Sequence, residues 1–207
     1  MGATEPRFVI LDGVDGSGKT TQAKRLVRAL EERGRPTPLH VREPGSTPLG
    51  ERLRAILLDS DVPAGAASEV LMFASARRQL LDTLVRPALA EGRDVICERF
   101  HPSTYAYQAV AGELSGEQVL ELLHGWANDP APDTVLLFDL DAEVAGARRQ
   151  GGDDRIESRG LDYLAAVVEG YRDYARRFPS LVELIDADAD VDVVTERMLW
   201  AFDQGAS

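Results

Sequence analysis

The sequence predicts an α/β fold with three layers, in which a five-stranded parallel sheet is covered by helices on both faces. Five short apolar runs have the length and composition of buried strands, at residues 8–12, 38–42, 94–98, 134–139 and 181–185. Long segments of helical periodicity separate them, and such alternation is typical of parallel sheets. The 207 residues match the size of one domain, and no linker divides them. We therefore expect residues 1–207 to form a single domain.

The expected helices fill the intervals between these strands. Apolar residues recur at helical spacing, as in the run that follows the first strand. The resulting segments are 21–33, 47–58, 68–89, 103–110, 115–126, 141–149, 161–178 and 191–202. In the third segment, Ser68 is a suitable N-cap and Pro87 should bend or end the helix. Residues 129–133, with two prolines, form a loop before the fourth strand.

Residues 13–20 read Gly-Val-Asp-Gly-Ser-Gly-Lys-Thr and match the phosphate-binding pattern G-x-x-x-x-G-K-[ST]. They stand between the first strand and the first helix, which is the context the motif requires. Glycines let several backbone N–H groups point at one phosphate, and the helix N-terminus adds partial positive charge. Lys19 would reach the β- and γ-phosphates of ATP, and Thr20 would hold Mg²⁺. The predicted ATP-binding residues are Gly13, Val14, Asp15, Gly16, Ser17, Gly18, Lys19, Thr20 and Thr21.

Composition and charge exclude several classes of protein. The net charge of −12 argues against a nucleic-acid partner, which would require a basic surface. No apolar run approaches the roughly 20 residues of a membrane span, and the first residues lack a signal-peptide pattern. Cys97 is the single cysteine, so an internal disulfide is impossible, and its apolar neighbours place it in a buried strand. We therefore expect a cytoplasmic protein.

Charged residues follow the strands at the edge where a parallel sheet binds ligands. Arg42 to Gly45 follow the second strand, Glu98 and Arg99 the third, and Asp139 the fourth. Cations and carboxylates that converge beside a phosphate loop favour Mg²⁺-dependent phosphoryl transfer. Either Glu98 or Asp139 could serve as the acid that holds Mg²⁺ through water, and both remain open.

Three further residues have both a functional and an ordinary interpretation. Asp15 would repel a phosphate, so it could accept a hydrogen bond from a sugar hydroxyl, or it could be a solvated turn residue. Phe73 and Arg77 are four residues apart on one helical face and could hold a nucleobase. Alternatively, Phe73 belongs to the core and Arg77 is a solvated charge. The histidines at positions 40, 101 and 124 show no metal-ligand spacing and receive no role.

A cluster of arginines surrounds the polar segment Gly151 to Asp154. Its members are Arg148, Arg149, Arg155 and Arg159. Arginines on a glycine hinge suit a lid over residues 148–160 that closes on phosphates. The ordinary interpretation is a solvated loop that neutralises itself through its own two aspartates.

The sequence resembles the thymidylate kinases, especially the bacterial ones, from about residue 8 to residue 202. The motifs that carry the resemblance lie at residues 13–20, 42–45, 69–77, 98–100, 103–108 and 154–157. The phosphate loop is shared by many nucleotide-binding proteins, but the whole set in this order is much more specific. The resemblance implies a P-loop kinase fold and transfer of phosphate from ATP, with Mg²⁺, to dTMP. The product would be dTDP for dTTP biosynthesis, and the enzyme would be a homodimer.

The resemblance also implies an acceptor site. Phe73 would stack on thymine, Arg77 would bind its carbonyl edge, and Thr104 and Gln108 would complete the base contacts. Tyr107 would crowd the 2′ position. Asp15 would take the 3′-hydroxyl, Arg99 with Arg42 would grip the acceptor phosphate, and Arg54 would lie near the base. The full set is Asp15, Arg42, Glu43, Pro44, Arg54, Phe73, Arg77, Arg99, Thr104, Tyr107 and Gln108.

Members of this family place a catalytic arginine either within the phosphate loop or in the lid. Residues 14–17 contain no arginine, so this chain resembles the second type. The catalytic residues implied are Lys19, Arg99, Arg149, Arg155 and Asp15. Which of Arg148 and Arg149 faces the phosphates stays open.

One departure from the family pattern is Glu98, where aspartate is usual. We assign Thr20 and Glu98 to the metal. However, Glu-Arg is also similar to the deoxynucleoside kinases, in which Glu98 would be a general base acting on a 5′-hydroxyl. A nucleotide-dependent switch and a kinase for a different nucleoside monophosphate are two more functions that a phosphate loop could serve.

Overall fold

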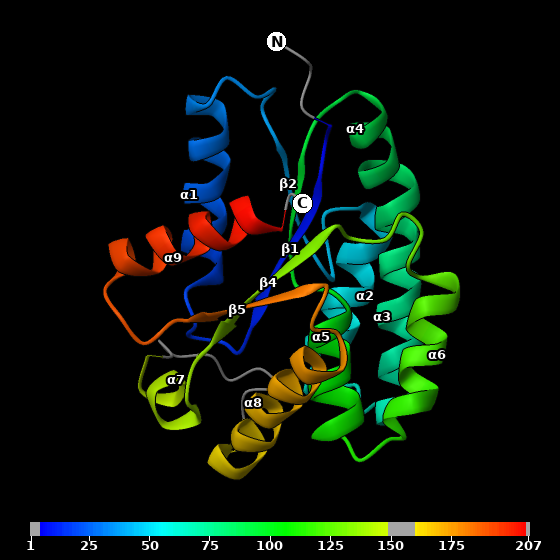
Figure 1. Cartoon of the computed structure of the whole chain (residues 1–207). Helices are drawn as coiled ribbons and strands as arrows, with labels where there is room; N and C mark the ends of the chain where they lie inside the picture. Colours follow the sequence, from blue (N-terminus) through cyan, green and yellow to red (C-terminus); the bar gives the residue numbers. More distant parts are fainter. Residues whose placement is uncertain (1–4, 149–159, 206–207) are drawn as a thin grey trace.

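The computed structural model describes residues 5–148 and 160–205 and contains the predicted five-stranded parallel sheet (Figure 1). Its strands are β1 (Phe8–Gly13), β2 (Leu39–Arg42), β3 (Val95–Glu98), β4 (Thr134–Asp139) and β5 (Val182–Asp186). They lie in the order β2-β3-β1-β4-β5, and every neighbouring pair is parallel. The order reverses beside β1, so a crevice opens at its carboxyl end.

Helices cover both faces of this sheet, as the sequence predicts. Helices α1 and α9 lie on one face, and α5 and α8 pack against the other (Figure 1). The helices are α1 (Lys19–Glu32), α2 (Pro48–Leu58), α3 (Ala66–Leu80), α4 (Arg86–Ala90), α5 (His101–Thr104), α6 (Gly116–Trp126), α7 (Ala142–Arg148), α8 (Gly160–Arg177) and α9 (Val191–Gln204). Two π-helical turns, η1 (Leu81–Val85) and η2 (Tyr105–Val110), continue α3 and α5. The predicted fold class is therefore confirmed.

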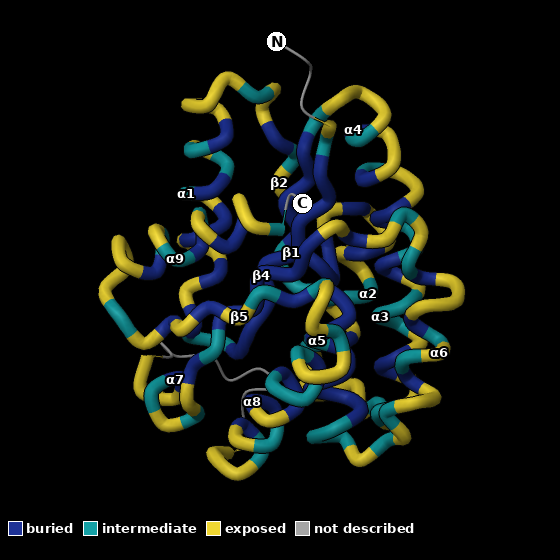
Figure 2. The backbone as a smooth tube through the Cα atoms, viewed as in Figure 1, coloured by how far each residue is buried: buried dark blue, intermediate teal, exposed yellow. Residues whose placement is uncertain are grey.

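The core is centred on the middle strands, which are buried on both sides (Figure 2). Phe8, Val9, Ile10 and Leu11 of β1 are all fully buried, which explains why the strand is continuously apolar and does not alternate. Cys97 is buried in β3, as expected. The two-sided burial makes the sheet a rigid platform, and its carboxyl edge carries the functional side chains.

The long helical segment around residues 68–89 differs from the prediction at two points. Helix α3 begins at Ala66 with Gly65 as its N-cap, so Ser68 lies inside the first turn and does not cap it. The second difference is the π-helical turn η1, which was not predicted and which places Pro87 at the start of α4. The segment ends at Ala90, close to the predicted end at residue 89 and just after Pro87, as expected. A wider turn changes which carbonyls need a donor, so the missing N–H of proline is tolerated at this position.

A buried carboxylate, Asp12, ties the end of β1 to its neighbours. It accepts hydrogen bonds from the backbone N–H groups of Gly13 (2.8 Å), Phe100 (3.0 Å) and Ser103 (3.0 Å). The hydroxyls of Ser103 (2.7 Å) and Tyr171 (2.9 Å) donate to it as well. Since Asp12 is fully buried, these donors replace the water that an exposed carboxylate would bind. The phosphate loop, the segment after β3 and helix α8 are thus joined at one point.

Within residues 5–148 and 160–205, no helix combines the length and apolar composition needed to cross a bilayer.

Candidate active site

The phosphate loop turns tightly between β1 and α1. Gly13 and Gly16 have φ values of 145° and 90°, in the region that favours glycine. A Cβ atom at Gly13 would lie 2.6 Å from the Phe138 carbonyl oxygen, and one at Gly16 would lie 2.8 Å from the Ala145 carbonyl oxygen. Gly18 caps α1 without a side chain, so no side-chain cap covers the N–H groups of its first turn. This arrangement suits an anionic phosphate.

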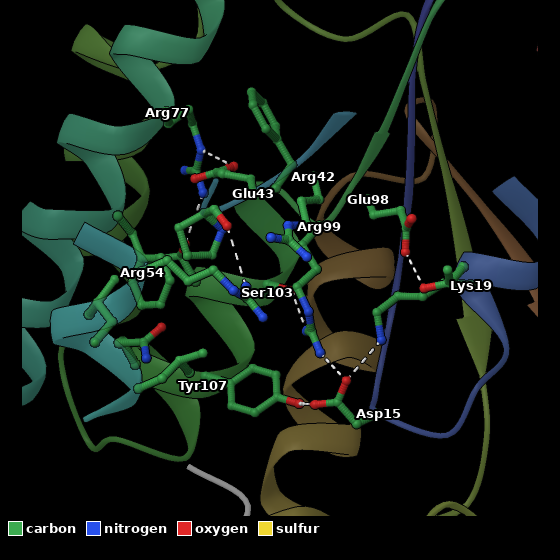
Figure 3. Close-up of a pocket in the computed structure, with 18 residues that line it drawn as sticks. Asp15, Lys19, Arg42, Glu43, Arg54, Arg77, Glu98, Arg99, Ser103 and Tyr107 are labelled. Carbon is green, nitrogen blue, oxygen red and sulfur yellow. Dashed lines mark hydrogen bonds and ion pairs between the residues drawn. The ribbon is translucent and has the colours of Figure 1, made fainter. Parts of the chain in front are cut away.

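A cavity of about 310 Å³ opens beside the phosphate loop, at the carboxyl ends of β1, β2 and β3. Every residue of the predicted acceptor site lines it, together with Lys19, Thr20 and Glu98 (Figure 3). The other predicted ATP-binding residues, Gly13, Val14, Gly16, Ser17, Gly18 and Thr21, belong to the loop and the first turn of α1 outside this lining. The structure therefore joins the predicted donor and acceptor residues in one continuous site.

Asp15 lies at the junction between the phosphate loop and the cavity (Figure 3). Its carboxylate pairs with Lys19 (3.1 Å) and Arg99, and the Tyr107 hydroxyl donates to it at 3.3 Å. Burial alone would raise the pKa of Asp15, but Arg99 and Lys19 outweigh it and lower that pKa. Burial lowers the pKa of Lys19, and Arg99 lowers it further. Asp15 thus holds two cations in place where phosphates are predicted to bind.

Arg99 leaves the end of β3 with a left-handed backbone, φ 66°. A non-glycine residue in this conformation costs free energy, which the surrounding structure must supply. Its backbone N–H donates to the Leu11 carbonyl at 2.9 Å. The guanidinium donates to the Ser103 hydroxyl (3.0 Å) and the Tyr171 hydroxyl (3.3 Å), which both donate in turn to Asp12. Asp12 therefore orients the Arg99 guanidinium indirectly, through the hydroxyls of Ser103 and Tyr171.

Glu98 and Thr20 form the candidate metal site. The Thr20 hydroxyl donates to Glu98, and His40 Nε2 lies 2.9 Å from the other carboxylate oxygen. Burial alone would raise the pKa of Glu98, but the hydrogen bonds from His40 and Thr20 outweigh it and lower that pKa. A hydroxyl and a carboxylate are oxygen ligands of the type Mg²⁺ prefers. Among the described residues, no three or more His, Cys, Asp or Glu side chains are grouped so as to hold a metal ion.

Asp139, the other candidate acid, is engaged elsewhere. Its carboxylate accepts hydrogen bonds from Arg172 Nε at 2.9 and 3.2 Å, on helix α8. Glu98 is therefore the acid that lies next to the phosphate loop.

Arg77 and Glu43 form a buried, hydrogen-bonded pair at the far wall of the cavity. Arg77 Nε donates to Glu43 at 2.8 Å, and Arg77 Nη2 donates to Thr104 at 3.0 Å. The guanidinium also lies over the Phe100 ring, 4.6 Å from its centre. The interpretation of Arg77 as a solvated charge is wrong, since the residue is 1% exposed. Burial raises the pKa of Glu43 to about 7, although Arg77 opposes the shift.

The remaining acceptor residues surround this wall. Phe73 is half-buried and faces the cavity. Arg54 Nη1 donates to the Pro44 carbonyl at 3.3 Å, and Arg42 Nη2 donates to both oxygens of Glu51 at 3.2 Å. Gln108 is 2% exposed, and its amide nitrogen donates to Glu69 at 2.9 Å.

The arginine cluster lies only partly in the described structure. Arg148 Nη1 donates to the Ala187 carbonyl and Nη2 to Asp188, both at 2.9 Å, in the loop between β5 and α9. Arg149, Arg155 and Arg159, with the rest of the proposed lid at 149–159, lie outside the described residues.

Several residues of the site were not identified from the sequence. Asp12, Glu69 and Tyr171 each support a predicted residue, and His40, which received no role, contacts Glu98. Asp12 could have been noticed as an acid that ends a wholly apolar strand. Glu69 opens the motif at residues 69–77, but nothing local marks it as the partner of Gln108. Tyr171 and His40 carry no such signal, because their partners are distant in the sequence.

A phosphate loop that adjoins a cavity lined by several cations and aromatic rings is the arrangement expected of P-loop nucleotide kinases. The family model for thymidylate kinase matches residues 11–198. The thymidylate kinase of Jannaschia sp. is 42% identical over 194 residues, covering 91% of this chain and 92% of the relative. That of Symbiobacterium thermophilum is 41% identical over 189 residues, covering 90% and 88%.

A solved structure gives the same result. The crystal structure of thymidylate kinase from Ehrlichia chaffeensis superposes with a TM-score of 0.78 at 27% identity, covering 96% of this chain and 98% of that one. The chain belongs to the thymidylate kinase family, whose members phosphorylate dTMP to dTDP with ATP as the phosphoryl donor.

The raised pKa of Glu43 predicts a pH dependence of stability. The folded state keeps a proton on Glu43 that the unfolded chain releases, between the ordinary pKa of 4.5 and about 7. Its contribution to stability therefore falls as pH rises across this interval, by about 3 kcal/mol in total. Glu43→Gln cannot titrate. We therefore compare the unfolding free energies of the two proteins at each pH. The value for Glu43→Gln minus the value for the wild type should increase by about 3 kcal/mol between pH 4.5 and 7.

Urea denaturation at pH 4.5, 5.5, 6.5 and 7.5 measures that difference. The exposed Glu32→Gln is the matched control, and its difference from the wild type should stay constant across the series. A difference for Glu43→Gln that does not vary with pH would contradict the assignment.

Proposed function

We propose that this chain transfers the γ-phosphoryl group of ATP in line to the 5′-phosphate of dTMP. The main support for the proposal is that the phosphate loop and the acceptor cavity share residues. Asp15, Lys19 and Arg99 lie both beside the phosphate loop and in the wall of the acceptor cavity. A kinase for nucleoside monophosphates requires this contiguity, because the two phosphates must meet. Membership of the thymidylate kinase family supports the choice of acceptor.

Phosphoryl transfer from ATP to dTMP requires two anionic phosphate groups to come into contact. The second pKa of a phosphate monoester is near ~6, so the acceptor oxygen already carries charge at neutral pH and needs no general base. The protein must instead offset repulsion and align the reacting groups. Lys19 and Arg99 both contact Oδ1 of Asp15 and supply positive charge there, and Arg42 adds more at the cavity wall.

Thr20 and Glu98 would hold Mg²⁺, whose contribution is to neutralise charge on the β- and γ-phosphates. The Thr20 hydroxyl is in direct contact with Glu98, so both oxygens already lie together. His40 holds the Glu98 carboxylate from its other side. This placement supports a metal-holding role for Glu98 in place of a general base.

The far wall suits a thymine base. Phe73 contributes an aromatic side chain to the lining, and the buried Nη1 of Arg77 has no hydrogen-bond partner among the described residues. An unpaired guanidinium donor at the wall suits a carbonyl of the base. Tyr107 donates to Asp15 and stands between the base wall and the phosphate loop, where the sugar would lie. We propose that Asp15 exchanges part of its contacts for the sugar 3′-hydroxyl when dTMP binds.

An assay of ADP release with ATP and Mg²⁺ tests the function on four parallel samples, containing dTMP, dUMP, thymidine or no acceptor. We expect turnover with dTMP, much less with dUMP, and none with thymidine. The physical reason is that the cationic part of the cavity requires an acceptor phosphate.

The same panel distinguishes the rival functions. Turnover with thymidine but not dTMP would indicate a deoxynucleoside kinase with Glu98 as its base. Hydrolysis that needs no acceptor would indicate a nucleotide-dependent switch.

We also propose that Arg149 and Arg155 deliver positive charge to the transferred phosphate from a lid at residues 148–160. Arg148, the other candidate of the pair, is already engaged by Ala187 and Asp188. The phosphate loop itself contains no arginine. A cation of this kind is worth on the order of 10³ to 10⁵ in rate in related phosphoryl transfers.

Replacing Arg155 with Ala should therefore lower kcat by about 10³ while changing the KM for dTMP by less than about tenfold. Steady-state kinetics measures both constants. The exposed Arg197→Ala, which removes a cation on the far helix α9, is the control. An unchanged kcat would exclude Arg155 from catalysis.

The neighbouring helices α2, α3 and α6 expose large apolar side chains. Ile56, Leu71 and Trp126 are 41%, 57% and 81% exposed. Exposed apolar side chains on adjacent helices are typical of protein interfaces. We propose that a second copy of the chain covers them in a homodimer.

Sedimentation velocity should show the wild type as a dimer. The variant Leu71→Glu places a charge in the proposed interface and should shift the equilibrium toward the monomer. A monomeric wild type would contradict the proposed homodimer.

A further inference from the structure

Glu69 and Gln108 form a buried hydrogen bond behind the acceptor cavity. Gln108 Nε2 donates to Glu69 Oε2 at 2.9 Å, and each residue is 2% exposed. Gln108 lines the cavity from the π-helical turn η2, whereas Glu69 comes from helix α3. Glu69, Phe73 and Arg77 follow one another at intervals of four, so they share one face of α3. Glu69 therefore reaches the base wall from the same helix that supplies two of its members.

This contact decides which end of the Gln108 amide is left without a hydrogen-bond partner. A carboxylate can only accept hydrogen bonds, whereas an amide has a donating nitrogen and an accepting oxygen. Glu69 therefore takes the nitrogen. The amide oxygen Oε1 is buried and has no hydrogen-bond partner in the described parts of the chain. A buried acceptor without a partner costs free energy, which a donor on a bound ligand would recover.

Arg77 provides the complementary group on the same wall. Its Nη1 is buried, carries N–H donors, and has no hydrogen-bond partner within residues 5–148 and 160–205. Both residues line the cavity, so its wall holds one buried donor and one buried acceptor that lack partners among the described residues. The imide edge of thymine offers the matching pair, a carbonyl oxygen and an N3–H. Cytosine offers the reverse at the same two positions, an amino group and a bare N3.

We propose that Glu69 is a specificity-determining residue, which excludes cytosine by holding the Gln108 amide with its oxygen toward the base. The inference rests on the proposed function, because it requires a pyrimidine monophosphate in this cavity. Glu69 touches no substrate. It acts by positioning Gln108, since turning the amide over would set its oxygen against the Glu69 carboxylate.

The test is the isosteric variant Glu69→Gln, assayed with dTMP and dCMP in the full-length chain. A glutamine at position 69 can accept or donate, so Gln108 can turn and offer its N–H₂ to N3 of cytosine. We expect kcat/KM for dCMP to rise by about tenfold and kcat/KM for dTMP to fall by a smaller factor. A gain with dCMP distinguishes this role from a structural one, because a damaged fold would lower both values.

A double-mutant cycle with Gln108→Leu provides the control. Without the amide, Glu69→Gln has nothing to reorient, so it should leave the dTMP-to-dCMP ratio unchanged in that background. Isothermal titration of both nucleotides into each variant gives the same comparison for binding alone. If Glu69→Gln fails to fold, Glu69→Ala also releases the amide and carries the same expectation.

Two outcomes would overturn the inference while the wild type still turns over dTMP. One is a selectivity that Glu69→Gln leaves within twofold of the wild type. The other is an equal loss of selectivity in the Gln108→Leu background, which would make the effect independent of the amide. A wild type inactive with dTMP would overturn the proposed function and this inference together, so the two failures are distinguishable.

Discussion

The hydrogen bonds of one buried carboxylate, Asp12, connect the parts on which the site depends. Its two oxygens accept from backbone and side-chain donors of the phosphate loop, the segment after β3 and helix α8. A buried carboxylate without these donors would cost several kcal/mol, so each donor is held firmly. Asp12 also affects the orientation of Arg99. The Arg99 guanidinium donates to the Ser103 and Tyr171 hydroxyls, and these hydroxyls donate to Asp12. Strand β1, which leads into the phosphate loop, therefore also orients Arg99 in the wall of the acceptor cavity.

The same principle recurs around the cavity. Glu43 holds Arg77, Glu69 holds Gln108, and Glu98 contacts Thr20. In each case a carboxylate behind or beside the ligand-facing group restricts its direction. Groups fixed in this way before a substrate arrives lose little conformational freedom on binding, which favours both affinity and alignment. The acidic residues of the site are therefore arranged mainly to orient donors.

The sequence could predict the platform and the ligand-facing residues, because both are encoded locally. Strand length, helical period and the residues that follow each strand identify the sheet and its functional edge. The supporting partners could not be predicted, since they meet only after folding. Arg77 and Glu43 are separated by 34 positions, Gln108 and Glu69 by 39, and His40 and Glu98 by 58. The π-helical turn η1 before Pro87 was also not predicted, because the spacing of apolar residues does not distinguish it from an α-helical turn.

The placement of charge has a consequence for how nucleotides arrive. The chain carries a net charge of −12, yet Lys19, Arg42, Arg54, Arg77 and Arg99 all line one cavity. Three carboxylates, Asp15, Glu43 and Glu98, line the same cavity, so the five cations still leave its wall net positive on an acidic chain. This contrast favours the approach of an anionic phosphate ester to the cavity over its approach elsewhere on the surface. Encounters are thus steered toward the productive entrance, and non-productive residence of nucleotides on the surface is reduced. Added salt screens both the attraction of a nucleotide to the cavity and its repulsion from the rest of the surface. The change in the nucleotide association rate with salt concentration therefore depends on which of the two interactions is stronger.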